Sequence, residues 1–266
     1  MPLLVDPFMA LAKGYALYRP TYPSRLVEVL IEASGGQESV RQKCAVDIGC
    51  GSGQLTLDLA KAGFHQVVGV DRSEAQLRAL EAKVIPGNAK FLQGEAVALP
   101  LPSGSCHLAC MAQMLHWVPF EQGLLEARRV LEPKSGVLGV TSYAIPRIVN
   151  DVEAQHALNR YYFDQLGSNK PPGQGCLWDI DRRRVDSGYE GEPFSRIFSL
   201  VERHQIEEMI PTTVGAFLGY LRTQTAYQNA LEVFENPLSI LEQILGGDDT
   251  KPLHTEITFH LIVCRV

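Results

Sequence analysis

The strongest constraint on the fold is the alternation of two hydrophobic periodicities between residues 44 and 145. Short, almost continuously apolar runs alternate there with longer stretches in which apolar residues recur every three or four positions. The first pattern is typical of strands buried on both faces, and the second of amphipathic helices. Strands alternating with helices predict a mostly parallel sheet covered on both faces. We therefore expect an α/β fold with a doubly wound sheet.

The predicted elements extend on both sides of this core. The strands of the core are expected at residues 44–49, 66–71, 89–94, 107–112 and 137–143, and its helices at residues 54–63, 74–84 and 120–132. Outside the core, helices are expected at 23–34, 212–235 and 237–245, and strands at 195–206 and 254–266. The last strand is expected to join the same sheet.

The chain is expected to have four parts. Residues 146–193 are polar and rich in turn residues, and they are too long for a plain connection inside a compact domain. We interpret them as an insertion or cap that contributes to a substrate site. Residues 1–43 then form an N-terminal arm and helix that act as a lid, residues 44–145 the ligand-binding core, and residues 194–266 the strands and helices that complete the sheet.

Composition excludes several classes of partner. The formal net charge of −6 argues against a surface built to neutralise nucleic acid. No segment approaches the roughly 20 apolar residues of a membrane span, and the six cysteines show neither a CxxC pair nor a zinc-ligand spacing. We therefore expect a cytoplasmic protein, a monomer or weak dimer, that binds neither nucleic acid, nor a membrane, nor a metal.

The stretch VDIGCGSG (46–53) places Gly49, Gly51 and Gly53 at alternate positions, between a predicted strand and a predicted helix. Glycines there permit positive φ angles and let backbone N–H groups approach a ligand at the carboxyl edge of the sheet. Asp71 ends the next strand, where its carboxylate can accept hydrogen bonds from ribose hydroxyls, and Arg72 beside it can lie along an adenine. The pattern favours a nucleotide-like ligand, with a tight turn and a helix cap as the simpler structural explanations.

The charge of the motif separates two ligand classes. A dinucleotide fingerprint has the spacing GxGxxG, whereas this motif has the spacing GxGxG. The acidic residue Asp47 precedes its first glycine, Gly49. That carboxylate would repel a pyrophosphate and attract an ammonium or sulfonium group. The residues therefore favour a cationic nucleoside, and an NAD-dependent dehydrogenase on a Rossmann-like fold remains the alternative.

Four separated pieces of the chain resemble the motif series of class I S-adenosylmethionine (SAM)-dependent methyltransferases. They are VDIGCGSG, VVGVDRSEAQL, FLQGEAVALPLPSGSCHLACMAQMLHWV and EARRVLEPKSGVLGV, in order from about residue 44 to 143. The flanking pieces KGYALYRPTYPSRLVEVL, RRRVDSGYEGEPF and FLGYLRTQTAY are similar to the small-molecule subgroup related to trans-aconitate methyltransferases. The resemblance implies a seven-stranded Rossmann-like sheet, SAM as the cofactor, and methyl transfer to a small-molecule acceptor, with an organic acid as a candidate.

The resemblance also implies a set of cofactor-binding residues. They are Asp47, Gly49, Cys50, Gly51 and Gly53 for the methionine end, Asp71 and Arg72 for the ribose and adenine, Glu95 and Ala96 for the adenine, Ala112 and Gln113 for the methionine moiety, and Arg19 for the methionine carboxylate or the substrate. One departure from the family is His107, where an aspartate is usual. Because that position starts the fourth strand, away from SAM, the change bears on strand geometry more than on the cofactor.

The catalytic residues are less defined by the sequence. His116 follows the fourth strand on the ligand edge and is the candidate general base, with a positioning role as the alternative. Tyr15, Tyr18, Tyr22 and Trp117 could cover the cofactor and acceptor, since aromatic faces suit a sulfonium, or could pack an N-terminal arm. The run Arg182–Arg184 is interpreted as a solvated face, with recognition of an acidic substrate as the sharper alternative. A non-catalytic SAM-binding regulatory protein is the remaining hypothesis.

Overall fold

The computed structural model of the chain describes residues 18–78, 80 and 83–266. Tyr15 and most of the predicted N-terminal arm lie outside the described residues, so that part of the lid hypothesis stays a prediction.

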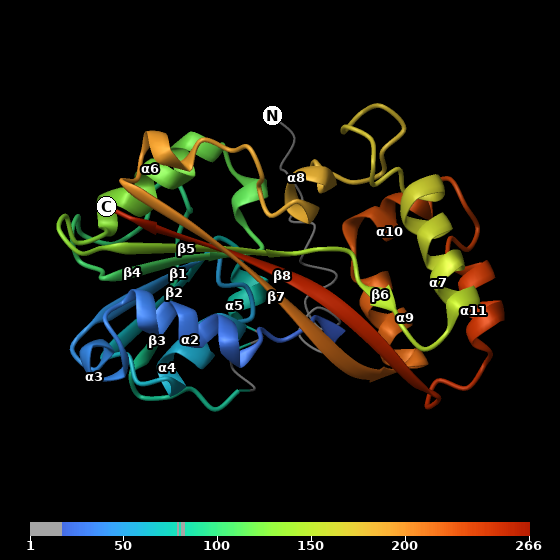
Figure 1. Cartoon of the computed structure of the whole chain (residues 1–266), viewed down its shortest axis with the longest axis horizontal. Coiled ribbons are helices and arrows are strands. Elements are labelled where there is room, and N and C mark those ends of the chain that lie inside the picture. The colour runs from blue at the N-terminus through green and yellow to red at the C-terminus, as the bar shows by residue number, and fades with distance from the viewer. Residues whose placement is uncertain (1–17, 79, 81–82) are drawn as a thin grey trace.

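The centre of the molecule is one twisted, mostly parallel sheet (Figure 1). Its strands are β1 (Cys44–Ile48), β2 (Gln66–Asp71), β3 (Ala89–Gln93), β4 (Leu108–Ala112), β5 (Val137–Tyr143), β6 (Arg147–Ile148), β7 (Leu200–Thr213) and β8 (Pro252–Arg265). The order is β3-β2-β1-β4-β5-β8-β6, with β7 paired to β8. Strands β1 to β5 are parallel, and β8 runs antiparallel to β5 and β7. The predicted doubly wound α/β class is confirmed, with eight described strands rather than seven because Arg147–Ile148 adds a short pairing to β8.

Helices cover both faces of this sheet. They are α2 (Ser24–Ala33), α3 (Gln37–Val40), α4 (Gln54–Lys61), α5 (Glu74–Arg78), α6 (Phe120–Val130), and the 3₁₀ turns η1 (Leu115–Trp117) and η3 (Phe194–Arg196). Alternate residues of each strand face opposite sides, so Ala45 packs with α2 and α4 whereas Val46 packs with α6. Figure 1 shows α2, α3 and α4 on one side and α6 on the other.

A second group of helices packs at one end of the sheet. It comprises α7 (Val152–Asn159), the π-helical turn η2 (Arg160–Gln165), α8 (Arg182–Asp186), α9 (Val214–Arg222), α10 (Thr225–Ala230) and α11 (Ser239–Leu245). These helices share one hydrophobic cluster that joins residues of 148–185 to residues of 214–253. We call this unit the cap. The predicted boundary at residue 193 therefore does not separate packing units, because side chains from both sides of it fill one core.

Three predicted elements differ in their bounds. The strand predicted at 195–206 begins at Leu200, after the turn η3, and continues to Thr213 because it pairs with β8 along its whole length. The helix predicted at 212–235 is broken after Arg222, where the Thr223 hydroxyl donates to the Tyr220 carbonyl and Gln224 takes an extended conformation. The described part of the helix predicted at 74–84 is α5, which ends at Arg78.

His107 has a structural role at the start of β4. Its Nδ1 accepts a hydrogen bond from the backbone N–H of Cys44, at 3.3 Å. The histidine thus ties the first residues of two neighbouring strands, β1 and β4, at the edge of the sheet opposite the glycine loop. Within the described part of the chain, no helix is long and apolar enough to span a membrane.

Candidate active site

The loop between β1 and α4 has three glycines with positive φ: 69° at Gly49, 53° at Gly51 and 76° at Gly53. A Cβ on Gly49 would lie 2.9 Å from Met114, and one on Gly53 would lie 2.8 Å from Leu80. A Cβ on Gly51 would find nothing nearer than the Gln76 side-chain oxygen, at 3.9 Å. Gly49 and Gly53 therefore permit close packing within the protein, whereas Gly51 leaves room for a ligand.

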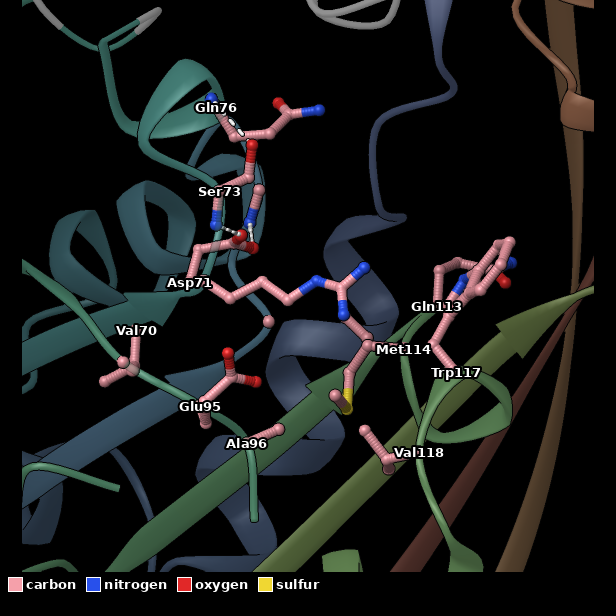
Figure 2. Close-up of a pocket in the computed structure, with 15 residues that line it drawn as sticks. Val70, Asp71, Ser73, Gln76, Glu95, Ala96, Gln113, Met114, Trp117 and Val118 are labelled. Atoms are coloured by element: carbon pink, nitrogen blue, oxygen red, sulfur yellow. Dashed lines mark hydrogen bonds between the residues drawn. The ribbon is translucent and has the colours of Figure 1, made fainter. Parts of the chain in front are cut away.

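A cavity opens beside this loop, at the carboxyl ends of β1, β2 and β4 (Figure 2). Its empty volume, including the part open to solvent, is about 790 Å³, within the roughly 300–1,000 Å³ usual for small-molecule sites. Its lining residues are Gly49, Gly51, Val70, Asp71, Arg72, Ser73, Gln76, Gly94, Glu95, Ala96, Ala112, Gln113, Met114, Trp117 and Val118. A smaller cavity shares Gly49, Gly51 and Ala112 with it and adds Tyr22, Asp47, Cys50, Ser52, Gln54 and Leu55. We call the two together the cleft.

Asp71 connects the glycine loop to the cleft. One carboxylate oxygen accepts from the backbone N–H of Gly51 and the other from that of Ser73, both at 2.8 Å (Figure 2). These bonds hold the carboxylate at the cleft wall. The predicted ribose-binding residue therefore lies where a ligand in the cleft can reach it.

Asp47 is buried behind the loop, with 1% of its surface exposed. Its Oδ2 accepts from the Thr56 hydroxyl at 2.6 Å, whereas its Oδ1 has no hydrogen-bond partner among the described residues. Burial raises the pKa of Asp47 to about 6, and the Thr56 hydrogen bond opposes part of that rise. A buried carboxylate with an oxygen to spare beside a cavity suits a cationic group such as an ammonium.

The cofactor affinity is expected to depend on the protonation of Asp47. As the pH falls through about 6, Asp47 becomes neutral and the affinity for SAM should fall, because the attraction for its ammonium is lost.

The stability of the unliganded protein should change in the opposite sense. The raised pKa means that the folded state binds the proton more tightly than the unfolded state, so stability decreases as the pH rises toward 6. Calorimetry and thermal unfolding between pH 5 and 8 measure both trends.

The variant Asp47→Asn is the matched control for this pH dependence. It keeps the shape of the side chain and removes the titration, so its SAM affinity should be weak and nearly constant over the same pH range. An Asp47→Asn protein whose affinity still fell sharply below pH 6 would assign the effect to another group.

Gln113, directly after β4, has an unusual conformation. Its φ is 55°, which is uncommon for a residue other than glycine, and its backbone N–H donates to the Thr141 carbonyl at 2.9 Å. The side-chain Nε2 is buried without a hydrogen-bond partner among the residues described. Figure 2 shows Gln113 beside Trp117 on one side of the cavity, with Asp71 and Glu95 on the other. Such a strained residue at a cavity wall indicates a functional constraint.

Glu95 and Ala96 lie on the loop after β3, and both line the cavity (Figure 2). Glu95 is exposed. Its carboxylate could therefore accept a hydrogen bond from the amino group of an adenine in the cavity. The cavity also contains Gln76, which the sequence reasoning missed. Gln76 is 3% exposed and its Oε1 lacks a partner in the described structure. Gln76 lies in the first turn of α5, shortly after Asp71, and this position is the sequence signal that could have identified it.

Arg19 lies on the cap side of the fold and does not line the cleft. Its Nη1 donates to the Tyr143 hydroxyl at 2.9 Å, its Nη2 donates to the Thr223 carbonyl at 3.2 Å, and its guanidinium lies 5.5 Å from the Tyr220 ring centre. Together with Tyr18 and Tyr220 it lines a separate cavity of about 670 Å³ between the N-terminal residues and α9. Arg19 therefore lines this second cavity and not the cavities beside the glycine loop.

His116 lies on η1, next to Trp117, which lines the cleft. Its Nδ1 is 2.8 Å from the hydroxyl of Tyr189. Desolvation, followed by the positive charges of Arg182, Arg184 and Arg19, lowers the pKa of His116 to about 3. A general base works best with a pKa near the operating pH. The lowered pKa of His116 therefore favours a positioning role over a role as general base.

The run Arg182–Arg184 is not a solvated face. Arg182 is 6% exposed, pairs with Asp186 at 2.7 Å and lies 5.2 Å from the Trp178 ring centre. Of the three arginines, only Arg183 is exposed, as a solvated face would require. The reason is that these residues form the helix α8, which turns successive side chains to different sides and brings Arg182 under the cap.

Trp178 also belongs to the cap rather than to a binding surface. It is 7% exposed, donates to the Ser168 hydroxyl at 2.8 Å and stacks on Tyr162. The described residues contain no cluster of three or more side chains that could bind a metal ion.

The chain is similar to methyltransferases in sequence and in structure. The profile of a family described as a methyltransferase domain matches residues 46–138. A Dictyostelium discoideum protein described as a methyltransferase is 28% identical over 222 residues, which cover 84% of this chain and 78% of that protein. The trans-aconitate 2-methyltransferase of Deinococcus radiodurans is 37% identical over 115 residues, 42% of this chain and 41% of the enzyme. A solved structure from Anaeromyxobacter dehalogenans, described as a type II methyltransferase, superposes with a TM-score of 0.75 at 29% identity, over 93% of this chain and 98% of that one.

The fold, the cleft and these matches together define a SAM-dependent methyltransferase. The mostly parallel sheet with its antiparallel last strand matches the Rossmann-like fold of class I methyltransferases. Between the two enzyme classes that the glycine loop left open, the matches decide for the methyltransferase.

The residues of the cleft fit the cofactor of this family. SAM supplies an activated methyl group on a positively charged sulfur. The buried Asp47 Oδ1 suits its ammonium, the Asp71 carboxylate its ribose hydroxyls, and the space at Gly51 the approach of the loop to the ligand. Each of these side chains is fixed by the strands and loop that carry it, so the protein can bind and orient the cofactor without rearranging the sheet.

Proposed function

We propose that the enzyme transfers the methyl group of SAM to a small anionic molecule, an organic acid. The observation that supports this most is the group of three arginines near His116, of which Arg182 and Arg184 pair with Asp186 and Glu192 while Arg19 lines the separate cavity beside α9. Arg19 approaches from the N-terminal segment and Arg182 and Arg184 from α8, and all three act on His116. Arginine is the side chain best suited to bind a carboxylate, through two parallel hydrogen bonds. The relative from Deinococcus radiodurans is itself named for an organic acid, trans-aconitate.

The protonation of the site agrees with such an acceptor. A carboxylic acid has a pKa near 4 and is already ionised at neutral pH, so no base is needed to prepare it. His116, whose pKa is lowered to about 3, would be a poor base for an amine or phenol acceptor. The work left to the protein is to align the two reactants and exclude water, which can contribute up to ~7–11 kcal/mol.

We propose the remaining roles as the family resemblance implies them, and the cavity linings are consistent with them. Asp47, Gly49, Cys50, Gly51 and Gly53 surround the methionine end, while Asp71, Arg72, Glu95 and Ala96 surround the adenosine. Ala112 and Gln113 face the methionine moiety, and Trp117 with Tyr18 borders the acceptor side. We further infer that the enzyme acts on small molecules in the cytoplasm, as a monomer or weak dimer, since its net charge of −6 does not favour nucleic acid.

A transfer assay with a base-lability step tests this proposal. The protein is incubated with methyl-labelled SAM and a panel of di- and tricarboxylic acids, together with matched amides and alcohols. We expect label to enter the acids and to be released as volatile methanol by mild alkali, because only a methyl ester hydrolyses that readily. Alkali-stable label in amines, phenols or thiols, with none in the acids, would contradict the acid acceptor while leaving the methyltransferase assignment intact.

A further inference from the structure

We propose that Tyr189 is a positioning residue that holds His116 in a single neutral tautomer, with its hydrogen on Nε2, so that His116 donates a hydrogen bond to the acceptor carboxylate. This inference rests on the proposed acid acceptor. It names two residues from distant parts of the chain, 73 positions apart, that the fold brings into one hydrogen bond.

The conformation of Tyr189 is the first observation. Its φ is 57°, in the left-handed region, and it is 1% exposed. For a bulky residue this is a true outlier that stores backbone strain. Arg203 stabilises it by donating to the carbonyls of Gly188 at 2.8 Å and of Tyr189 at 3.0 Å, and the Tyr189 N–H donates to the Arg184 carbonyl at 2.7 Å. The fold thus maintains a strained backbone at the residue whose hydroxyl reaches His116.

The hydrogen bond itself determines the tautomer. The Tyr189 hydroxyl lies 2.8 Å from His116 Nδ1, and the described hydrogen bonds offer the phenol hydrogen no other acceptor. A buried hydroxyl that donated to nothing would destabilise the folded protein, because its hydrogen would have lost water as an acceptor. Tyr189 therefore donates to Nδ1, which must be unprotonated. In a neutral imidazole the hydrogen then resides on Nε2.

The surrounding charges keep the ring neutral. Arg182 and Arg184 on α8 and Arg19 on the N-terminal segment all disfavour an imidazolium at His116, and Asp186 and Glu192 are engaged by Arg182 and Arg184. Burial raises the pKa of Tyr189, so its hydroxyl keeps its hydrogen. At neutral pH the pair therefore has one N–H donor that the contact with Tyr189 does not use, the Nε2–H of His116.

The other ring nitrogen of His116, Nε2, has no hydrogen-bond partner among the described residues. His116 is only partly buried, and its ring centre lies 5.6 Å from that of Trp117, which lines the cleft. An N–H donor among three guanidinium groups suits an anion and would be opposed by a cation. His116 would therefore touch the acceptor, and Tyr189 would act only through His116.

Nitrogen-15 NMR of the imidazole rings tests the tautomer without any acceptor. In the wild-type enzyme with SAM we expect the His116 signals, assigned with His116→Gln, to show a protonated Nε2 and an unprotonated Nδ1 at pH 7. In Tyr189→Phe the two tautomers should exchange, and Nδ1 should lose its pure acceptor shift. The control is Tyr162→Phe, which removes an equally buried hydroxyl, bonded to Gln224 at 2.8 Å, and should leave the His116 signals unchanged. A protonated Nδ1 in the wild-type enzyme would overturn the inference.

Kinetics then separate this inference from the proposed function. Once the transfer assay has identified an acid substrate, Tyr189→Phe should lower kcat/KM for it about tenfold while the SAM dissociation constant stays within twofold. If the wild-type enzyme methylates no acid, the proposed function fails, although the NMR result can still stand. If it methylates an acid and Tyr189→Phe does so equally well, the role given to Tyr189 is wrong.

Discussion

Replacing Asp71 by alanine should weaken SAM binding about 100-fold. The carboxylate is expected to accept charge-assisted hydrogen bonds from the cofactor's ribose hydroxyls, each worth about 1.5–3 kcal/mol, and a total near 3 kcal/mol corresponds to two orders of magnitude. The same carboxylate holds the backbone N–H groups of Gly51 and Ser73, so its removal also loosens the loop. Calorimetric titration with SAM at neutral pH measures the effect.

The variant Asp71→Asn separates the two contributions. It keeps the size of the side chain and one oxygen acceptor, but turns the other position into a donor. We expect an intermediate loss, about tenfold, with a smaller drop in melting temperature than in Asp71→Ala. A dissociation constant for Asp71→Ala within threefold of the wild-type value would show that the cofactor does not contact this carboxylate.

Replacing Gly51 by valine should reduce SAM binding more than 100-fold. The new side chain would project into the cleft, because a Cβ at this position meets no protein atom closer than 3.9 Å. It would thus occupy space that the ligand needs. The backbone φ of 53° adds strain of about 1–2 kcal/mol for a residue other than glycine. The protein should still fold, and calorimetry with SAM gives the loss.

The matched control is Gly104→Val. Gly104 has a similar φ of 67°, and a Cβ there would lie 3.5 Å from Pro133, an ordinary contact distance. It precedes β4, at the opposite edge of the sheet from the cleft. This variant should lose a comparable amount of stability and bind SAM normally. Equal SAM affinity in Gly51→Val and wild type would mean that the ligand does not enter the space beside the loop.

The core of the fold could be predicted because its signals are local. Strands β1, β2 and β4 are short apolar runs, each followed by a turn and a helix, and the sequence pattern places all five parallel strands, β1 to β5, within a residue or two. The glycine loop is equally local, and its three positive φ angles follow from its residue types. The distinction between Gly51 and its two neighbours is not local, since it depends on Met114 and Leu80 from other elements.

The cap could not be predicted in the same way. Its core joins residues of 148–185 to residues of 214–253, and no sequence periodicity links segments so far apart. For the same reason the sequence suggested that Arg182 is solvated, although its partners Asp186, Tyr143 and Trp178 bury it. The contact of Tyr189 with His116 depends on a strained backbone, which propensity rules disfavour.

The proposal that the cleft beside the glycine loop holds SAM is tested by a crystal structure grown with S-adenosylhomocysteine in large excess. We predict the adenosyl group in the cavity of about 790 Å³, its ribose hydroxyls within hydrogen-bond distance of Asp71 and its ammonium near Oδ1 of Asp47. A structure in which the ligand binds elsewhere, or in which the protein's own side chains fill the cleft, would contradict this assignment.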